Sequence, residues 1–147
     1  MYLQQWVWQQ EHTTGSPPLS VENCGFTVVG RRVVMYGGYC GHGACYHNSL
    51  CELDTTTLRW TELAPSEAEG APLRKGACGV VAHSSGGEEQ LCVIGGYGLL
   101  NSSTHQPASL YVENKKTGRG WTNEFHCFTS GEHTQYTHHS AEYVRMM

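Results

Sequence analysis

The stretch Cys40–His47 carries four side chains of the types that bind metal ions. It places Cys40, His42, Cys45 and His47 within eight residues, and thiolate and imidazole are common zinc ligands. The spacings are tighter than those of most structural zinc sites, and ligand types without a recognised spacing are weak support for a metal. We therefore interpret this stretch as a Gly-rich loop between two strands, and we assign no metal and no other cofactor.

The sequence shows no arrangement typical of catalysis. Its single Asp, Asp54, falls in a predicted turn between strands. No nucleophile and base occur at a recognised motif spacing. We therefore predict that the protein is not an enzyme. The alternative is the remnant of a metal-dependent enzyme that uses the cysteines and histidines of the Cys40–His47 stretch.

The composition argues against a nucleic-acid or membrane partner. The net charge is -4, and basic residues cluster no more densely than in pairs such as Arg31-Arg32, whereas a nucleic-acid surface needs a basic face. No apolar run approaches the roughly 18 residues of a membrane span, and the first residues lack a signal-peptide pattern. We expect a cytoplasmic or nuclear protein whose seven cysteines are reduced.

Two segments of the chain repeat one pattern of short apolar runs. Each has an apolar run, a turn, a second apolar run and a Gly-Gly pair, which is typical of a β-hairpin. The first turn is tight, around Gly30, and the second is expected to hold the longer insertion Ser84–Glu89. The predicted strands and Gly pairs are Cys24–Val29, Arg31–Tyr36 and Gly37-Gly38 in the first segment, and Cys78–Ala82, Gln90–Ile94 and Gly95-Gly96 in the second.

Further predicted strands complete each unit. Asn48–Leu53 and Leu58–Leu63 follow the first hairpin, and Asn123–Phe128 follows the second. Trp6–Gln10 is expected to be the last strand of a preceding unit. Four short antiparallel strands repeated at a period near 54–58 residues are typical of β-propeller blades. The predicted fold is all-β, with about two propeller blades plus one strand of an incomplete propeller.

The predicted units divide the chain into four parts. Residues 1–21 form the last strand and linker of a preceding blade, 22–74 a first blade, 75–137 a second blade, and 138–147 a disordered tail. The second blade carries a long insertion loop over 97–121, and its fourth strand is expected to be short or frayed. Because two blades leave apolar faces uncovered, we expect the chain to be part of a larger propeller and to self-associate when alone.

The Gly-Gly pairs, the Tyr-rich stretch after the first pair, and Trp60 give the chain a family resemblance. Together they resemble the kelch repeat, in which Gly pairs allow a sharp turn and the Trp fills the gap between blades. This resemblance implies a propeller that serves as a binding module. It also implies that any enzymatic remnant would be that of a metal-dependent kelch-propeller enzyme.

A second resemblance lies in the run Gly95–Leu100, the polar loop after it and the run Arg119–His126. It is similar to kelch substrate receptors of cullin-RING ubiquitin ligases that capture protein C-termini ending in Gly-Gly. The resemblance implies a protein or peptide as partner, and a cullin-RING ligase adaptor as a second one. It implies that Tyr97 and Trp121 line the peptide pocket, with Lys75 as the nearest match to a pocket lysine. A packing role for Tyr97 and Trp121 remains the alternative.

Overall fold

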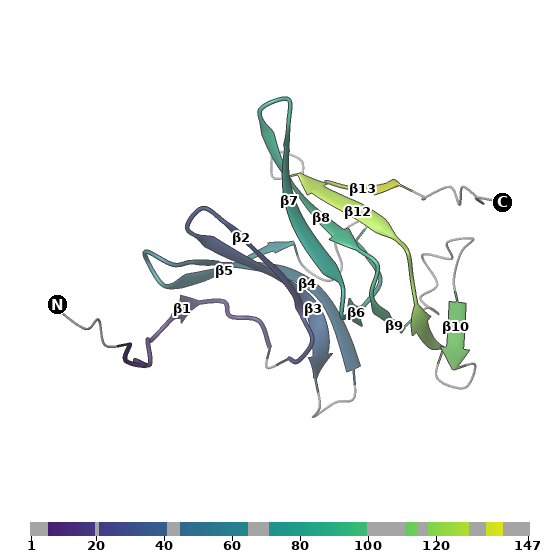
Figure 1. Cartoon of the computed structure of the whole chain (residues 1–147), viewed down its shortest axis with the longest axis horizontal. Coiled ribbons are helices and arrows are strands. Elements are labelled where there is room, and N and C mark those ends of the chain that lie inside the picture. Colours follow the sequence, from purple (N-terminus) through teal and green to yellow (C-terminus); the bar gives the residue numbers. More distant parts are fainter. Residues whose placement is uncertain are drawn as a thin grey trace.

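The computed structural model is an all-β protein. It describes residues 6–19, 21–40, 45–64, 71–99, 111–114, 118–129 and 135–139. These residues form thirteen strands in three sheets and no helix (Figure 1). No described segment is therefore a helix long and apolar enough to cross a membrane. The predicted all-β class is confirmed.

The first sheet contains the first predicted repeat. Its strands lie in the order β1-β5-β4-β3-β2, and β2 to β5 form an antiparallel meander. The strands are β1 (Thr14–Gly15), β2 (Gly25–Val29), β3 (Arg32–Cys40), β4 (Cys45–Asp54) and β5 (Arg59–Ala64). The four strands predicted for this repeat are confirmed. However, β3 does not stop at Gly37-Gly38, because a register shift between Tyr36 and Gly38 absorbs the pair as an irregularity.

The strand predicted over Trp6–Gln10 is wrong. These residues form no strand, and the side chains of Trp6 and Trp8 are almost fully exposed. The chain joins the sheet later, where β1 pairs parallel with β5. A strand needs a neighbour for its backbone hydrogen bonds. Of the described residues before β2, only Thr14 and Gly15 pair with β5.

A second meander corresponds to the second predicted repeat. Its strands lie in the order β13-β12-β8-β7, and all neighbours are antiparallel. The strands are β7 (Gly79–Ser85), β8 (Glu88–Ile94), β12 (Phe125–Thr129) and β13 (Gln135–His139). The expected long insertion at the hairpin tip is wrong: β7 and β8 extend to a two-residue turn, Gly86-Gly87, in which both residues have positive φ.

The fourth strand of this meander is more regular than the sequence indicates. β13 pairs with β12 at every position from Gln135 to His139. β13 is therefore a five-residue strand that is paired rather than frayed, and the predicted disordered tail does not include His138 and His139. Residues 140–147, with the rest of the predicted tail, lie outside the described residues.

The predicted insertion loop 97–121 contains strands of its own. A small sheet in the order β10-β11-β9-β6 is built mostly from it. Its strands are β6 (Lys75–Gly76), β9 (Tyr97–Leu99), β10 (Tyr111–Asn114) and β11 (Arg119–Trp121). β9 follows β8, and β11 precedes β12, so this sheet continues the hairpin β8–β12 past Gly95-Gly96. Residues 100–110 and 115–117 of the loop lie outside the described residues.

The main core lies between the two meanders. Apolar side chains from β3, β4 and β5 pack against side chains of β7, β8 and β12, with Val34, Tyr36 and Val93 fully buried. The Tyr36 hydroxyl donates to the carbonyl of Leu73 at 3.1 Å, which anchors the connection between the repeats. Trp60 is half-buried on β5 and does not belong to this core. Trp60 therefore does not fill the gap between these two meanders, and its packing between blades stays a prediction.

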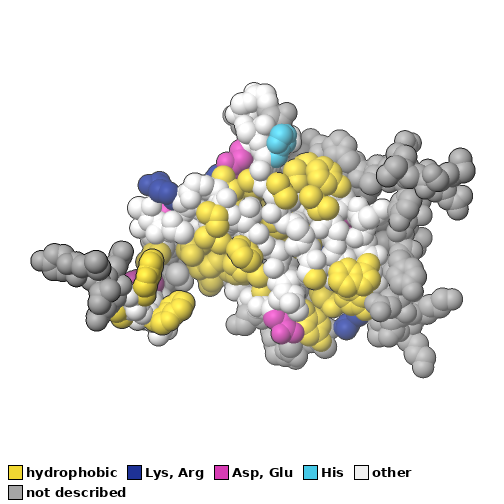
Figure 2. All heavy atoms as spheres, viewed as in Figure 1, with side chains coloured by type: hydrophobic (Ala, Val, Ile, Leu, Met, Phe, Trp, Pro, Cys, Tyr) yellow, Lys and Arg dark blue, Asp and Glu magenta, His cyan; other side chains and the backbone are white. Residues whose placement is uncertain are grey.

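Other apolar side chains remain on the outside of the meanders. Phe26 and Val28 of β2 are about two-thirds exposed, and Val81 of β7 and Ile94 of β8 nearly half. Figure 2 shows hydrophobic side chains gathered over the region of β2 and β3. These faces therefore present apolar surface to the solvent.

Candidate functional site

The two Gly-Gly pairs have the same backbone conformation. The φ angles are 64° and 106° at Gly37 and Gly38, and 61° and 112° at Gly95 and Gly96. Such positive angles are favourable only for glycine. Each pair is followed by a Tyr, so Tyr39 and Tyr97 occupy equivalent positions in the two repeats.

Each of these tyrosines faces an aromatic residue on the neighbouring strand. Tyr39 of β3 is paired with Tyr46 of β4, and Tyr97 of β9 with Trp121 of β11. The paired rings have centroids 5.0 Å and 5.1 Å apart in tilted and edge-on arrangements. The two repeats therefore carry the same kind of aromatic pair at the same position.

The two aromatic pairs meet and line one groove. The rings of Tyr46 and Tyr97 lie edge-on with centroids 6.2 Å apart, which joins the pairs into a row of four rings. We call the hollow beside this row the aromatic groove, and its volume is about 480 Å³. It is lined by Glu22, Asn23, Tyr39, Tyr46, Gly76, Ala77, Tyr97 and Trp121.

Arg119 places a positive charge at this row. Its guanidinium carbon lies 5.3 Å from the centre of the Tyr46 ring and 5.8 Å from that of Tyr39, within the range of cation–π attraction. Burial raises the pKa of the Tyr46 hydroxyl, so that ring stays neutral. Glu22 adds one carboxylate to the lining. The row of rings thus lies beside the Arg119 cation, and the groove lining includes the carboxylate of Glu22.

The structure brings together two of the three residues predicted for peptide binding. Tyr97 is half-buried, and half of the Trp121 surface is exposed to solvent beside it. Lys75 is fully buried and therefore offers no surface to a peptide. Tyr39, Tyr46 and Arg119 were missed, although the equivalence of Gly-Gly-Tyr in both repeats gave a signal for Tyr39.

Lys75 instead forms a buried ion pair with Glu124, and His126 lies next to Glu124. Its Nζ lies 3.2 Å from Glu124 Oε2, and His126 Nε2 lies 3.6 Å from Glu124 Oε1. Burial lowers the pKa of Lys75. Burial alone would raise the pKa of Glu124, but His126 and the Lys75 charge outweigh it and hold that pKa below its usual value.

The Lys75–Glu124 ion pair connects backbone segments next to the groove. Lys75 is in β6, directly before the groove residue Gly76, and Glu124 follows β11 by three residues. Their contact therefore ties β6 to the connection between β11 and β12. The buried pair fixes the backbone that carries Tyr97 and Trp121.

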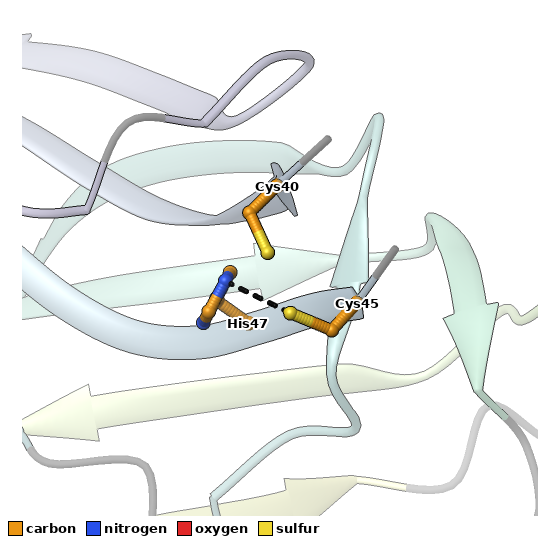
Figure 3. A group of neighbouring side chains, drawn as sticks. All are labelled: Cys40, Cys45 and His47. Carbon is orange, nitrogen blue, oxygen red and sulfur yellow. Dashed lines mark hydrogen bonds between the residues drawn. The ribbon is translucent and has the colours of Figure 1, made fainter. Parts of the chain in front are cut away.

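The candidate metal ligands are also brought together in part. Figure 3 shows Cys40, Cys45 and His47 turned toward one another at the end of the β3–β4 hairpin. Their ligand atoms all lie within 4.8 Å of one another. His42, the fourth candidate, lies outside the described residues.

Comparison with known proteins adds no family assignment. No family model matches the sequence, and no curated protein shows significant similarity to it.

Proposed function

We propose that this protein is a kelch-type propeller module that binds a peptide or protein segment in the aromatic groove. The observation that carries the proposal is the row of four rings, contributed equally by two repeats and still half-exposed at Trp121. Aromatic anchors in a partly enclosed site dominate the binding energy of many protein interfaces. Because the rings lie on paired strands, they are already positioned before a ligand arrives, which lowers the entropic cost of binding.

Two further observations support the propeller part of the proposal. The described chain contains two consecutive four-stranded antiparallel meanders that pack face to face, as neighbouring blades do. Exposed apolar side chains such as Phe26 and Val28 are accounted for if these faces contact further blades. The proposed partners are a peptide, taken to be a protein C-terminus by the kelch resemblance, and a cullin-RING ligase adaptor in the cytoplasm or nucleus.

The proposal is tested by titrating the full chain into a fluorescent peptide that ends in Gly-Gly and following the anisotropy. We expect binding that is lost when the peptide carries a C-terminal amide. Tyr97→Ala and Trp121→Ala should each weaken it by about thirtyfold, equivalent to about 2 kcal/mol for a hot-spot residue. Trp8→Ala is the matched control, since Trp8 is fully exposed away from the groove lining.

The same experiment can overturn the assignment of the groove as the site and the selection of a C-terminus. If the peptide binds and both groove variants retain its affinity within about twofold, the rings serve packing and the groove is not the site. If the amidated and free peptides bind equally, the groove binds peptides without selecting a C-terminus.

A further inference from the structure

The Cys40, Cys45 and His47 side chains have the geometry of three ligands of one metal ion. Cys45 Sγ lies 3.6 Å from His47 Nε2. A tetrahedral zinc ion with a Zn–S bond of about 2.3 Å and a Zn–N bond of about 2.0–2.1 Å would place sulfur and nitrogen about 3.6 Å apart. The spread of all three ligand atoms, 4.8 Å at most, lets a single ion reach each of them after small rotations of the side chains.

The strand pairing explains why these three residues meet although they are close in sequence. Cys40 lies directly opposite Cys45 in the antiparallel ladder, which brings the two cysteines side by side. Cys45 and His47 are two residues apart on β4, so their side chains leave the strand on the same face. Cys40 is fully buried, whereas Cys45 and His47 are half-buried, which leaves a path for an ion to enter.

The second repeat shows that its architecture does not require this cluster. Gly98 and Gly120 are paired next to the Tyr97–Trp121 pair, as Cys40 and Cys45 are next to Tyr39–Tyr46. The residue after Trp121 is Thr122, where the first repeat has His47 after Tyr46. The second repeat thus has no Cys or His at the three equivalent positions, although it keeps the aromatic pair next to them.

We propose that Cys40, Cys45 and His47 form a binding site for a divalent zinc-type ion. Two thiolates and an imidazole favour such thiophilic metals over magnesium or calcium, and both thiols release their protons on binding. Three protein ligands leave the fourth position of a tetrahedral ion to water or to an added ligand. The ion clamps the end of the β3–β4 hairpin, whose other face presents Tyr39 and Tyr46 to the groove. The proposal does not depend on what the groove binds.

The site is tested with Co²⁺, which reports its ligands by absorption. The full chain is reduced, stripped of metal with a chelator and titrated with Co²⁺ while thiolate-to-cobalt charge-transfer absorption is recorded. We expect one equivalent to bind with the bands of a tetrahedral thiolate site and to be displaced by one equivalent of Zn²⁺. Zn²⁺ should also raise the thermal midpoint of the protein, because a ligand that binds the folded state stabilises it.

Two variants locate the ion, and two matched variants serve as controls. Cys45→Ser should remove much of the charge-transfer absorption. His47→Gln should weaken cobalt binding by more than about a hundredfold, because losing a residue that only hydrogen-bonds to a metal ligand already lowers metal affinity about tenfold to a hundredfold. Cys24→Ser removes another half-buried thiol and His83→Gln an exposed histidine, and both should bind as the parent does. Circular dichroism confirms that each variant is folded.

Three outcomes would overturn the site. The first is the absence of cobalt charge-transfer absorption in the reduced parent. The second is absorption and affinity that survive both Cys45→Ser and His47→Gln in folded protein. The third is a Cys40–Cys45 disulfide, detected by mass spectrometry, whose reduction does not restore stoichiometric metal binding.

Discussion

The two repeats present the same aromatic pair but support it in different ways. In the first repeat β3 and β4 run unbroken past the Gly pair, and Cys40, Cys45 and His47 lie behind the rings. In the second repeat the chain divides at Gly95-Gly96 into β8 and β9, which belong to different sheets. There the buried Lys75–Glu124 ion pair joins β6 to the connection between β11 and β12. The aromatic pair therefore has the same position after the Gly pair in both repeats, although different residues lie next to it in each.

The contrast also shows why the second repeat divides. In the first repeat a single bridge joins Glu22 to Tyr39. At the equivalent place in the second repeat, Lys75–Gly76 forms a strand, β6, along β9. Gly98 permits this approach, since a Cβ there would lie only 2.7 Å from Lys75 Cα. β9 thus gains a neighbour that draws it into a separate sheet.

The sharpest test of this contrast is removal of the buried charge in the second repeat. Glu124→Gln should destabilise the protein by about 3–5 kcal/mol, because it leaves the Lys75 ammonium buried without its counter-charge. Urea unfolding followed by tryptophan fluorescence measures the change. Lys75→Met combined with Glu124→Gln should restore most of the stability, since it removes both charges. If the single and double variants are equally unstable, the ion pair is not what supports this repeat.

The acid sensitivity of the same pair has a definite sign. The pKa of Glu124 is lower in the folded protein than its usual value of 4.5. Its ionised form therefore contributes stability above about pH 4.5, and this contribution is lost as the pH falls through the lowered folded value. Glu124→Gln should lack this part of the acid dependence. Identical pH profiles for parent and variant would contradict the assignment.

Replacing the second glycine of each pair compares the two turns directly. The φ angles of Gly38 and Gly96 are nearly equal, so alanine should be equally strained in both, by about 1–3 kcal/mol. A Cβ at Gly96 would also lie 2.8 Å from the backbone oxygen of Gly76 in β6. At Gly38 it would lie 2.8 Å from Val21 Cβ and 3.1 Å from the backbone oxygen of Glu22, in a segment outside the named strands that can shift more easily. We expect Gly96→Ala to cost about 2–4 kcal/mol in total and Gly38→Ala less.

The control for this comparison is Gly30→Ala. Gly30 has a φ of 58°, but a Cβ there would meet no atom within 4 Å. Urea unfolding should therefore show only the conformational cost, about 1 kcal/mol. A larger loss of unfolding free energy for Gly38→Ala than for Gly96→Ala would mean that β6 shifts more easily to admit the new Cβ than the segment around Val21 does.

Local patterns in the sequence predicted most of the strands but not all of the pairing between them. The apolar runs and the tight turn at Gly30 gave the two meanders with small errors at their ends. Trp6–Gln10 has the composition of a strand, yet these residues form no strand. The run from Tyr97 to Trp121 looks like a loop because its pairing with Lys75–Gly76 spans more than twenty residues.

The candidate site was predicted only as far as its residue types allowed. Tyr97 and Trp121 were found through a family resemblance, and their contact at 5.1 Å needs the β9–β11 pairing to be known. Lys75 was misplaced because its burial depends on Glu124, a partner 49 residues away. The spacing of Cys40, Cys45 and His47 gave no recognised metal motif, since a hairpin rather than a helix or a knuckle brings them together.

If both repeats serve one groove, aromatic residues of the first repeat should matter as much as those of the second. Tyr46→Ala should weaken the binding of the Gly-Gly peptide by about thirtyfold, the effect expected of Trp121→Ala. Its ring contacts Tyr39 and Tyr97 and lies beside the Arg119 cation. Fluorescence anisotropy measures the change, and Phe26→Ala, an exposed aromatic on β2, is the control. An effect confined to Trp121 would restrict the site to the second repeat.

The smallest expected effect concerns the ion pair that links the two repeats at their outer ends. Arg32 of β3 donates to both carboxylate oxygens of Glu89 in β8, one at 2.7 Å, and also contacts Glu52 at 3.2 Å. Both side chains are about one-third exposed, so the pair should be worth at most about 1 kcal/mol.

Glu89→Gln should lower the free energy of unfolding by that amount in dilute buffer and by much less in 1 M salt, where charges are screened within about 3 Å. Glu88→Gln, at the neighbouring exposed position, is the control for a change in net charge. A loss of several kcal/mol that persists in high salt would show that this contact, rather than the apolar core, holds the two repeats together.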